Sequence, residues 1–147
     1  MSVAEWNDHG GPVMSEDKIR VLLTKIGIDS HDLGIRNLTL SLREGGMEVI
    51  YTGLRMPIES IPKVTIEEDV DVIGVSFLQG AHLALSPLLV KELKEAGVGD
   101  IPVIVGGIIP PKDIPKLKEK GIREVFLPGT RFEEIATYIK SLVELNR

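Results

Sequence analysis

An alternation of two hydrophobic patterns is the feature that most limits how this chain can fold. From Lys18 onward, short β-branched runs alternate five times with longer stretches whose apolar residues recur at helical spacing. Parallel strands need long crossovers, usually helices, so the alternation predicts a parallel sheet. Because such crossovers are right-handed, we expect helices on both faces of that sheet.

The expected strands and helices can be bounded from the sequence. Strands are predicted at Ile19–Thr24, Met47–Tyr51, Val70–Ser76, Pro102–Val105 and Glu124–Leu127. Helices are predicted at Leu33–Glu44, Pro57–Glu68, Leu83–Glu95, Pro111–Lys120 and Phe132–Leu145. Five such units most often form a flavodoxin-like (Rossmann-like) α/β fold with strand order 2-1-3-4-5, which binds ligands beyond the carboxyl ends of its strands.

Size and composition indicate one domain that binds neither nucleic acid nor membrane. The chain has 147 residues, a formal net charge of −5, no cysteine and no basic cluster. We therefore expect a small molecule or another protein as the partner. The lack of cysteine excludes disulfides and thiolate zinc sites and suits the cytoplasm.

The first seventeen residues do not follow the alternating pattern. They contain Gly10, Gly11, Pro12 and several acidic residues, without the basic start or apolar core of a signal peptide. We expect a flexible leader at 1–17 and a single domain at 18–147. An arm that docks on another subunit through Trp6 is the alternative.

Polar residues and glycines gather where three of the expected strands end. The stretch KIGIDSHDLG follows the first strand, Ser76 ends the third, and Gly106-Gly107 follows the fourth. With Gly34, these glycines leave a predicted slot between strands one, three and four, although glycine also serves simply to end strands. Ser76 either points into this slot or caps the following helix.

His31 is the strongest candidate for a functional side chain. The alternative is that it is only a solvent-exposed histidine in a loop. Asp29 is close enough in sequence to accept a hydrogen bond from one ring nitrogen and leave the other for a metal. The sequence has no second cluster of histidine or cysteine to complete a protein-only metal site with His31, Asp29 and Asp32. A single protein ligand is enough only for a metal that a macrocycle already holds.

Three motifs in this chain resemble those of cobalamin-binding domains. The run Asp29-Ser30-His31-Asp32-Leu33-Gly34 is similar to Asp-x-His-x-x-Gly, Ser76-Phe77-Leu78 to Ser-x-Leu, and Gly106-Gly107 to the glycine pair. The likeness runs from about Lys18 to the C-terminus. The segments VIYTGLR, EEDVDVIGVS, GGIIPPKDIPKLKEKG and LPGT further resemble the coenzyme-B12-dependent acyl-CoA mutases, of which methylmalonyl-CoA mutase is one.

The resemblance implies that the chain binds adenosylcobalamin with its base displaced from cobalt. His31 would be the axial ligand of cobalt, Asp29 would orient its ring, and Lys25 would hydrogen-bond Asp29. The displaced nucleotide tail would enter the slot. The implied cofactor-binding positions are Asp29, Ser30, His31, Asp32, Gly34, Ser76, Leu78, Gly106, Gly107, Gly129 and Thr130. Ser30 and Leu33 depart from the commoner glycine and arginine of the mutase motif.

The resemblance also implies a partner protein, because the chain has no room for a substrate-binding barrel of about 250 residues. We expect a small subunit that covers the barrel of a large catalytic subunit, in a heterotetramer of two of each. Methylmalonyl-CoA, isobutyryl-CoA and 2-hydroxyisobutyryl-CoA all remain open as substrates.

Two other functions are compatible with the same fold. A cobalamin carrier or sensor without mutase activity usually has a helical cap domain before the histidine motif, which the short leader cannot form. A phosphoacceptor receiver domain needs an aspartate after strand three and a lysine after strand five, where this chain has Ser76 and Leu127-Pro128.

Overall fold

The strands form one parallel sheet in the predicted order. A computed structural model of the chain describes residues 18–26, 33–77 and 80–146. The five strands are β1 (Arg20–Thr24), β2 (Glu48–Tyr51), β3 (Val72–Phe77), β4 (Val103–Gly107) and β5 (Glu124–Phe126). Their order is β2-β1-β3-β4-β5 and every neighbouring pair is parallel, which confirms the flavodoxin-like prediction. The predicted leader at 1–17 lies outside the described residues.

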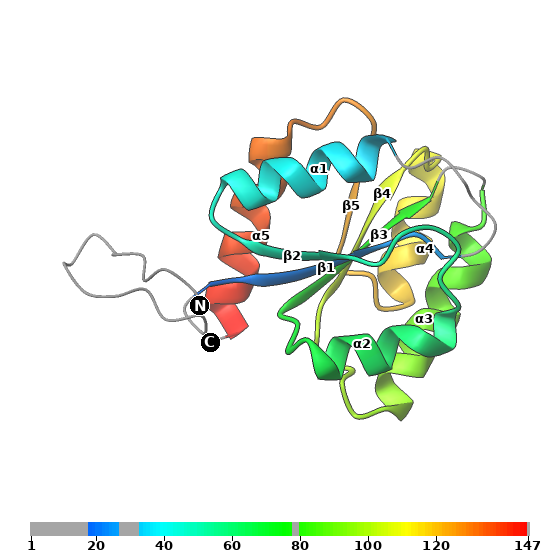
Figure 1. The fold of residues 1–147 in the computed structure, drawn as a ribbon. Helices are drawn as coiled ribbons and strands as arrows, with labels where there is room; N and C mark the ends of the chain where they lie inside the picture. Colours follow the sequence, from blue (N-terminus) through cyan, green and yellow to red (C-terminus); the bar gives the residue numbers. More distant parts are fainter. Residues whose placement is uncertain (1–17, 27–32, 78–79, 147) are drawn as a thin grey trace.

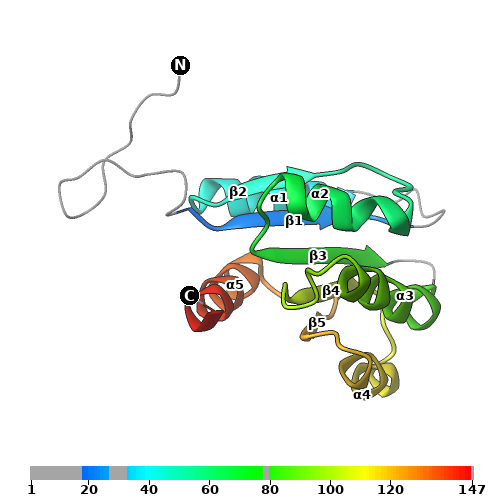
Figure 2. The same cartoon turned by 90° about the horizontal axis from the view of Figure 1, so that it is seen from below.

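The helices cover both faces of the sheet. They are α1 (Leu33–Glu44), α2 (Ile61–Glu67), α3 (His82–Glu95), α4 (Ile114–Glu119) and α5 (Phe132–Asn146). Helices α1 and α5 lie on one side, and α2, α3 and α4 on the other (Figures 1 and 2). Within the described part of the chain, no helix is long and apolar enough to cross a membrane.

Two of the predicted helices are split. Short 3₁₀ turns, η2 (Ile58–Ser60) and η3 (Pro111–Asp113), precede α2 and α4, where the sequence pattern predicts continuous helices. Pro62 and Pro115 stand in the first turns of α2 and α4. A proline has no N–H to bond back into the preceding turn, so that turn closes with tighter 3₁₀ bonds and each α-helix begins one residue before its proline.

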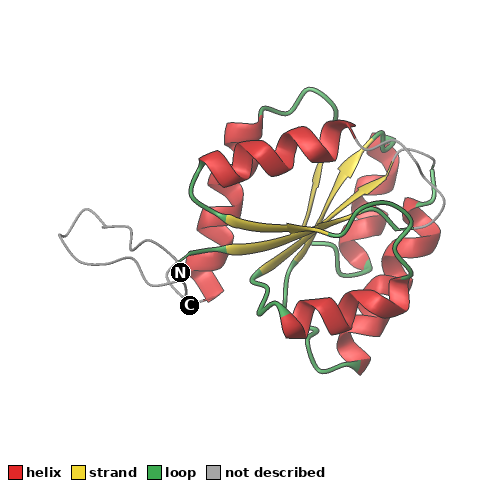
Figure 3. Cartoon of the chain, viewed as in Figure 1, coloured by secondary structure: helices red, strands yellow, loops and turns green. Residues whose placement is uncertain are grey.

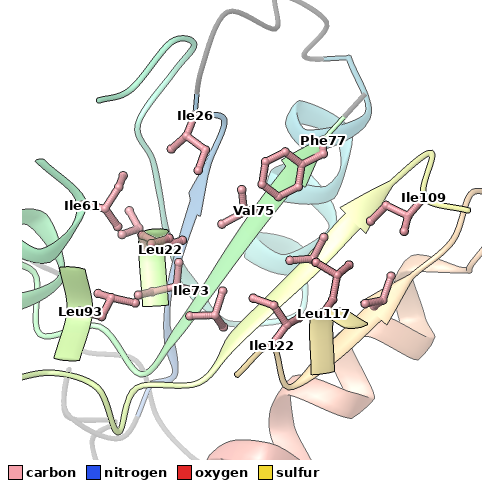
Figure 4. Close-up of a cluster of buried hydrophobic side chains, with 14 of the residues drawn as sticks. Leu22, Ile26, Ile61, Ile73, Val75, Phe77, Leu93, Ile109, Leu117 and Ile122 are labelled. Atoms are coloured by element: carbon pink, nitrogen blue, oxygen red, sulfur yellow. The ribbon is translucent and has the colours of Figure 1, made fainter. Parts of the chain in front are cut away.

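The face under α2, α3 and α4 is filled with large apolar side chains, and we call it the packed face. Alternate residues of β3 point to it: Ile73, Val75 and Phe77. They meet Leu93 of α3 and Leu117 of α4, and Figure 4 shows these side chains in one cluster. All five are at most 3% exposed, so this side has a continuous core from one end of β3 to the other.

The face under α1 and α5, called here the open face, is filled along only part of the strands. Val21 of β1 and Val72 of β3 pack with Leu42 of α1 and Leu142 of α5. Farther along β3, the residues on this face are Gly74 and Ser76. The helices therefore have little to pack against near the carboxyl ends of the strands.

At the amino edge of the sheet, Arg20 joins β1 to β2 and to the segment that leads from α2 into β3. Its guanidinium pairs with Glu48 of β2 and with Glu68, and its backbone N–H donates to Asp71 Oδ2 at 2.9 Å. These groups hold one edge together with charged contacts. The loops that begin the βα connections leave from the opposite edge, as Figure 3 shows.

Candidate functional site

A cavity of about 310 Å³ lies on the open face, at the carboxyl edge of the sheet. Its walls include Leu23 of β1, Ile104 of β4, Phe126 of β5, Ile35 of α1 and Ile139 of α5. Of the described residues that line it, only Ser76 and Thr130 carry a polar side chain. The site is thus an apolar slot with two hydroxyl groups.

Small residues on neighbouring strands create this cavity. Ser76 of β3 is paired in register with Gly106 of β4, and both lie on the open face because strand residues alternate. A Cβ added at Gly106 would meet only the Phe126 carbonyl oxygen, at 3.7 Å. The missing side chain at Gly106 therefore leaves open space directly beside the Ser76 hydroxyl.

The second glycine of the pair has a different role. Gly107 has φ +126°, and a Cβ there would lie 1.7 Å from the Phe77 carbonyl oxygen. That oxygen accepts a hydrogen bond from the N–H of Ile108, 3.2 Å away. Gly107 is needed for the close approach of β4 to β3, whereas Gly106 leaves open space in the cavity.

A tight turn after β5 forms the far end of the cavity. The Thr130 N–H and hydroxyl both donate to the Leu127 carbonyl oxygen, at 3.1 and 2.7 Å. Pro128 and Gly129 are the two central residues, and Gly129 has φ +92°. Proline followed by a glycine at positive φ is typical of a type II turn, which brings Gly129 and Thr130 to the cavity.

A buried lysine connects the end of β1 to the cavity. Lys25 is fully buried, and its Nζ donates to the carbonyl oxygen and to Oγ of Ser76, at 3.3 Å each. The Lys25 carbonyl oxygen accepts from the N–H of Met56 at 3.0 Å. The contact with Ser76 was not predicted from the sequence.

The alternative in which Ser76 caps a helix is wrong, because Ser76 lies within β3 and Ala81 precedes α3.

The predicted slot lies farther toward β5 than expected. The sequence places it between strands one, three and four, but β1 contributes only Leu23, and β5 and the turn after it form one wall. The site positions that the structure brings together around the cavity are Gly34, Ser76, Gly106, Gly107, Gly129 and Thr130.

The predicted metal ligand and its neighbours lie outside the described residues. These are Asp29, Ser30, His31 and Asp32 after β1, and Leu78 after β3. Their roles, and the predicted bond from Lys25 to Asp29, stay predictions. Among the described residues, no group of three or more histidine or acidic side chains is arranged to hold a metal ion.

One buried polar pair was missed from the sequence. His82 Nε2 lies 2.9 Å from Asp113 Oδ2, and both side chains are buried on the packed face. The pair joins the start of α3 to η3, and the Phe77 ring packs edge-on against His82. No sequence pattern pairs the two residues, because they are 31 positions apart and His82 belongs to none of the motifs, although Asp113 lies in the segment GGIIPPKDIPKLKEKG.

Comparisons with known proteins identify the family to which this chain belongs. The model of the B12 binding domain family matches residues 19–136. The 2-hydroxyisobutanoyl-CoA mutase small subunit of Aquincola tertiaricarbonis is 45% identical over 130 residues, which cover 88% of this chain and 96% of that protein. The pivalyl-CoA mutase small subunit of Xanthobacter autotrophicus is 44% identical over 129 residues, 88% of this chain and 86% of that one.

A solved structure shares the fold at lower sequence similarity. The cobalamin-binding protein from Desulfitobacterium hafniense superposes with a TM-score of 0.74 at 20% identity, over 85% of this chain and 59% of that chain. This likeness supports the sheet order and helix placement alone. The family match and the two relatives, which extend over most of the chain, decide the assignment. The chain belongs to the B12-binding domain family and, within it, to the small subunits of acyl-CoA mutases, which are isomerases.

Proposed function

We propose that this small subunit binds adenosylcobalamin with the cofactor's base displaced from cobalt and His31 in its place. The observation that carries the proposal is the cavity on the open face. It lies at the edge where the segment with His31 follows β1, and Gly34, Ser76, Gly106, Gly107, Gly129 and Thr130 all line it.

The cavity suits the displaced nucleotide tail of such a cofactor. A benzimidazole is flat and largely apolar, and the cavity is narrow, apolar and open at the sheet edge. Three glycines in its lining leave open space, since a Cβ at Gly34 or Gly129 would meet nothing within 4 Å and one at Gly106 only a carbonyl oxygen at 3.7 Å. The residues present therefore fit the group.

The chain's own residues would hold the cofactor and keep water away from it. Asp29 would accept a hydrogen bond from the His31 ring and fix its orientation, with Ser30 and Asp32 flanking the ligand. Ser76 and Leu78 would lie beside the tail base, and Gly129 and Thr130 near its end. When bound, the cofactor supplies the radical chemistry that rearranges a carbon skeleton.

A large catalytic subunit with an acyl-CoA-binding barrel is the proposed partner, in a heterotetramer of two small and two large subunits. Exposed aliphatic side chains come after the carboxyl ends of four strands: Leu33, Leu54, Leu83 and Ile108, which are 73%, 36%, 41% and 58% exposed. Apolar groups gathered at one edge suit a protein interface. The proposed place of action is the cytoplasm, which the cysteine-free sequence suits.

The proposed substrate class is a branched acyl-CoA. Two relatives that match most of this chain are named for 2-hydroxyisobutanoyl-CoA and pivalyl-CoA, whose acyl groups are both branched. The residues that distinguish one acyl group from another would lie mainly on the large subunit. The small subunit would contribute the cofactor and the cover over the reaction site, which keeps a radical away from solvent.

Electron paramagnetic resonance tests the proposal directly. The purified chain would be mixed with cob(II)alamin whose benzimidazole nitrogens are labelled with nitrogen-15. We expect a superhyperfine pattern from an unlabelled axial nitrogen, and its loss in the His31→Ala variant. A pattern from the labelled nitrogen would show that the base stays on cobalt and would overturn the histidine assignment.

A further inference from the structure

Lys25 has an unusual position for a lysine. It is fully buried just after β1, on the strand face that also carries Leu23, and its Nζ reaches across to β3. There it donates to both oxygen atoms of Ser76, at 3.3 Å each. Lysine is rarely buried unless polar groups hydrogen-bond its nitrogen. The contact with Ser76 therefore helps to stabilise Lys25 in this buried position.

This contact decides what the Ser76 hydroxyl can offer to a ligand. A hydroxyl has one donor and two acceptor positions, and a lysine nitrogen brings only donors when charged. Because Lys25 donates to Ser76 Oγ, the hydroxyl proton must point elsewhere. On the open face of β3 the adjacent space is the cavity, so Ser76 presents its proton to whatever the cavity holds.

No other described side chain in the cavity wall provides a comparable donor. Thr130 is the second hydroxyl there, and it donates to the Leu127 carbonyl oxygen at 2.7 Å. The remaining described lining residues are glycine, proline, aliphatic or aromatic. Ser76 is half-buried, so a ligand that fills the cavity would cover its hydroxyl, and a ligand group with an acceptor atom beside Ser76 is then favoured because a covered hydroxyl without a partner is costly.

We infer that Lys25 is a positioning residue for the cofactor tail. By donating to Ser76 it directs the serine hydroxyl into the cavity, and so it favours a tail base that carries an acceptor nitrogen. The inference rests on the proposed function, because it needs the tail in this cavity. It assigns Lys25 a role in tail recognition that is separate from any bond to the segment with His31.

The test compares two corrinoids, cobalamin and cobinamide, which lacks the nucleotide tail. Dissociation constants for the full chain would be measured by absorbance titration for the wild type, Lys25→Met, Ser76→Ala and the double variant. We expect Lys25→Met and Ser76→Ala each to lower the preference for cobalamin over cobinamide about tenfold, as the loss of one buried hydrogen bond would. We expect the double variant to lose no more than either single variant, because both changes remove the same hydrogen bond.

The ratio of the affinities for cobalamin and cobinamide shows whether Lys25 acts on the nucleotide tail or on the ligation of cobalt. If Lys25 acts only through the segment with His31, Lys25→Met weakens cobalamin and cobinamide by the same factor, and that equal loss overturns the inference. Failure of the wild type to bind cobalamin would overturn the proposed function instead. Equal binding of cobalamin and cobinamide by the wild type would overturn the tail placement and, with it, the inference.

A second measurement does not depend on a change at the buried lysine. A cobamide whose tail ends in a phenol has no ring nitrogen to accept the Ser76 proton. We expect the wild type to bind it about tenfold more weakly than cobalamin, and Ser76→Ala to show little preference between the two. Equal binding of both cobamides by the wild type would contradict the donor role of Ser76.

Discussion

The two faces of the sheet use the same strands but are filled differently. On the packed face, β3 presents Ile73, Val75 and Phe77, so large side chains continue to the carboxyl end of the strand. On the open face the same strand presents Val72 and then Gly74 and Ser76. Because side chains alternate along a strand, one stretch of sequence builds a core on one side and lines a cavity on the other.

This difference separates stability from binding. The packed face gains the free energy of continuous apolar burial, while the open face gives up part of that burial next to the cavity. A ligand that fills the cavity would recover stability in proportion to its affinity. Changes on the packed face should therefore affect folding in the absence of ligand, and changes beside the cavity should affect binding.

The largest expected loss of stability is at Gly107, where β4 approaches β3 closely. In Gly107→Ala the new methyl group would lie 1.7 Å from the Phe77 carbonyl oxygen, at a residue with φ +126°. Backbone strain and the separation of β4 from β3 should lower the free energy of unfolding by more than about 4 kcal/mol. Urea denaturation followed by circular dichroism measures this loss, and a stability equal to that of the wild type would contradict the close contact.

A matched pair of isoleucines compares the two faces directly. Ile73 of β3 lies in the packed cluster, and Ile104 of β4 lies in the cavity wall, and both are at most 3% exposed. We expect Ile73→Ala to cost about 4 kcal/mol and Ile104→Ala about 2 kcal/mol, because Ile104 has empty space on one side. The urea midpoints of the two variants test this order, and equal losses would show that the cavity wall is as tightly packed as the core.

Filling the cavity should have a small effect on folding and a large one on binding. A Cβ at Gly106 has room, so Gly106→Val should change the free energy of unfolding by less than about 1 kcal/mol. Its methyl groups would occupy the space proposed for the tail. We expect cobalamin to bind at least about tenfold more weakly, with cobinamide unchanged. Retained cobalamin affinity in a folded variant would place the tail elsewhere.

The sequence predicts the scaffold well and the contacts across it poorly. Strand order and the placement of Ser76 and Gly106 at one edge follow from hydrophobic period and strand alternation, which are local properties. The 3₁₀ turns before α2 and α4 depend on Pro62 and Pro115, whose effect on the preceding turn is not part of the hydrophobic pattern. The contacts from Lys25 to Ser76 and from His82 to Asp113 join residues 51 and 31 positions apart, so they depend on the folded paths of side chains that no local pattern describes.

The smallest effect is a dependence of stability on alkaline pH at the open face. Burial raises the pKa of the Tyr138 phenol from its usual value of 10.0, and the neighbouring Glu124 carboxylate raises it further. The folded chain then holds this proton to higher pH than the unfolded chain does. The stability that Tyr138 contributes is fully present at a pH below the pKa of the phenol in the unfolded chain. It is lost as the pH rises through the higher pKa of the phenol in the folded chain.

The variant Tyr138→Phe isolates this effect, because it removes the titrating hydroxyl and keeps an aromatic ring against Phe126, whose centroid is 5.5 Å away. Between about pH 9 and pH 11 the wild type should lose slightly more stability than Tyr138→Phe, measured as the shift of the urea midpoint. Lysine deprotonation over the same range affects both proteins, so the difference between them reports on Tyr138 alone. Identical pH profiles would mean that solvent reaches this phenol freely, and that the helix α5 side of the open face is looser than its contact with Phe126 indicates.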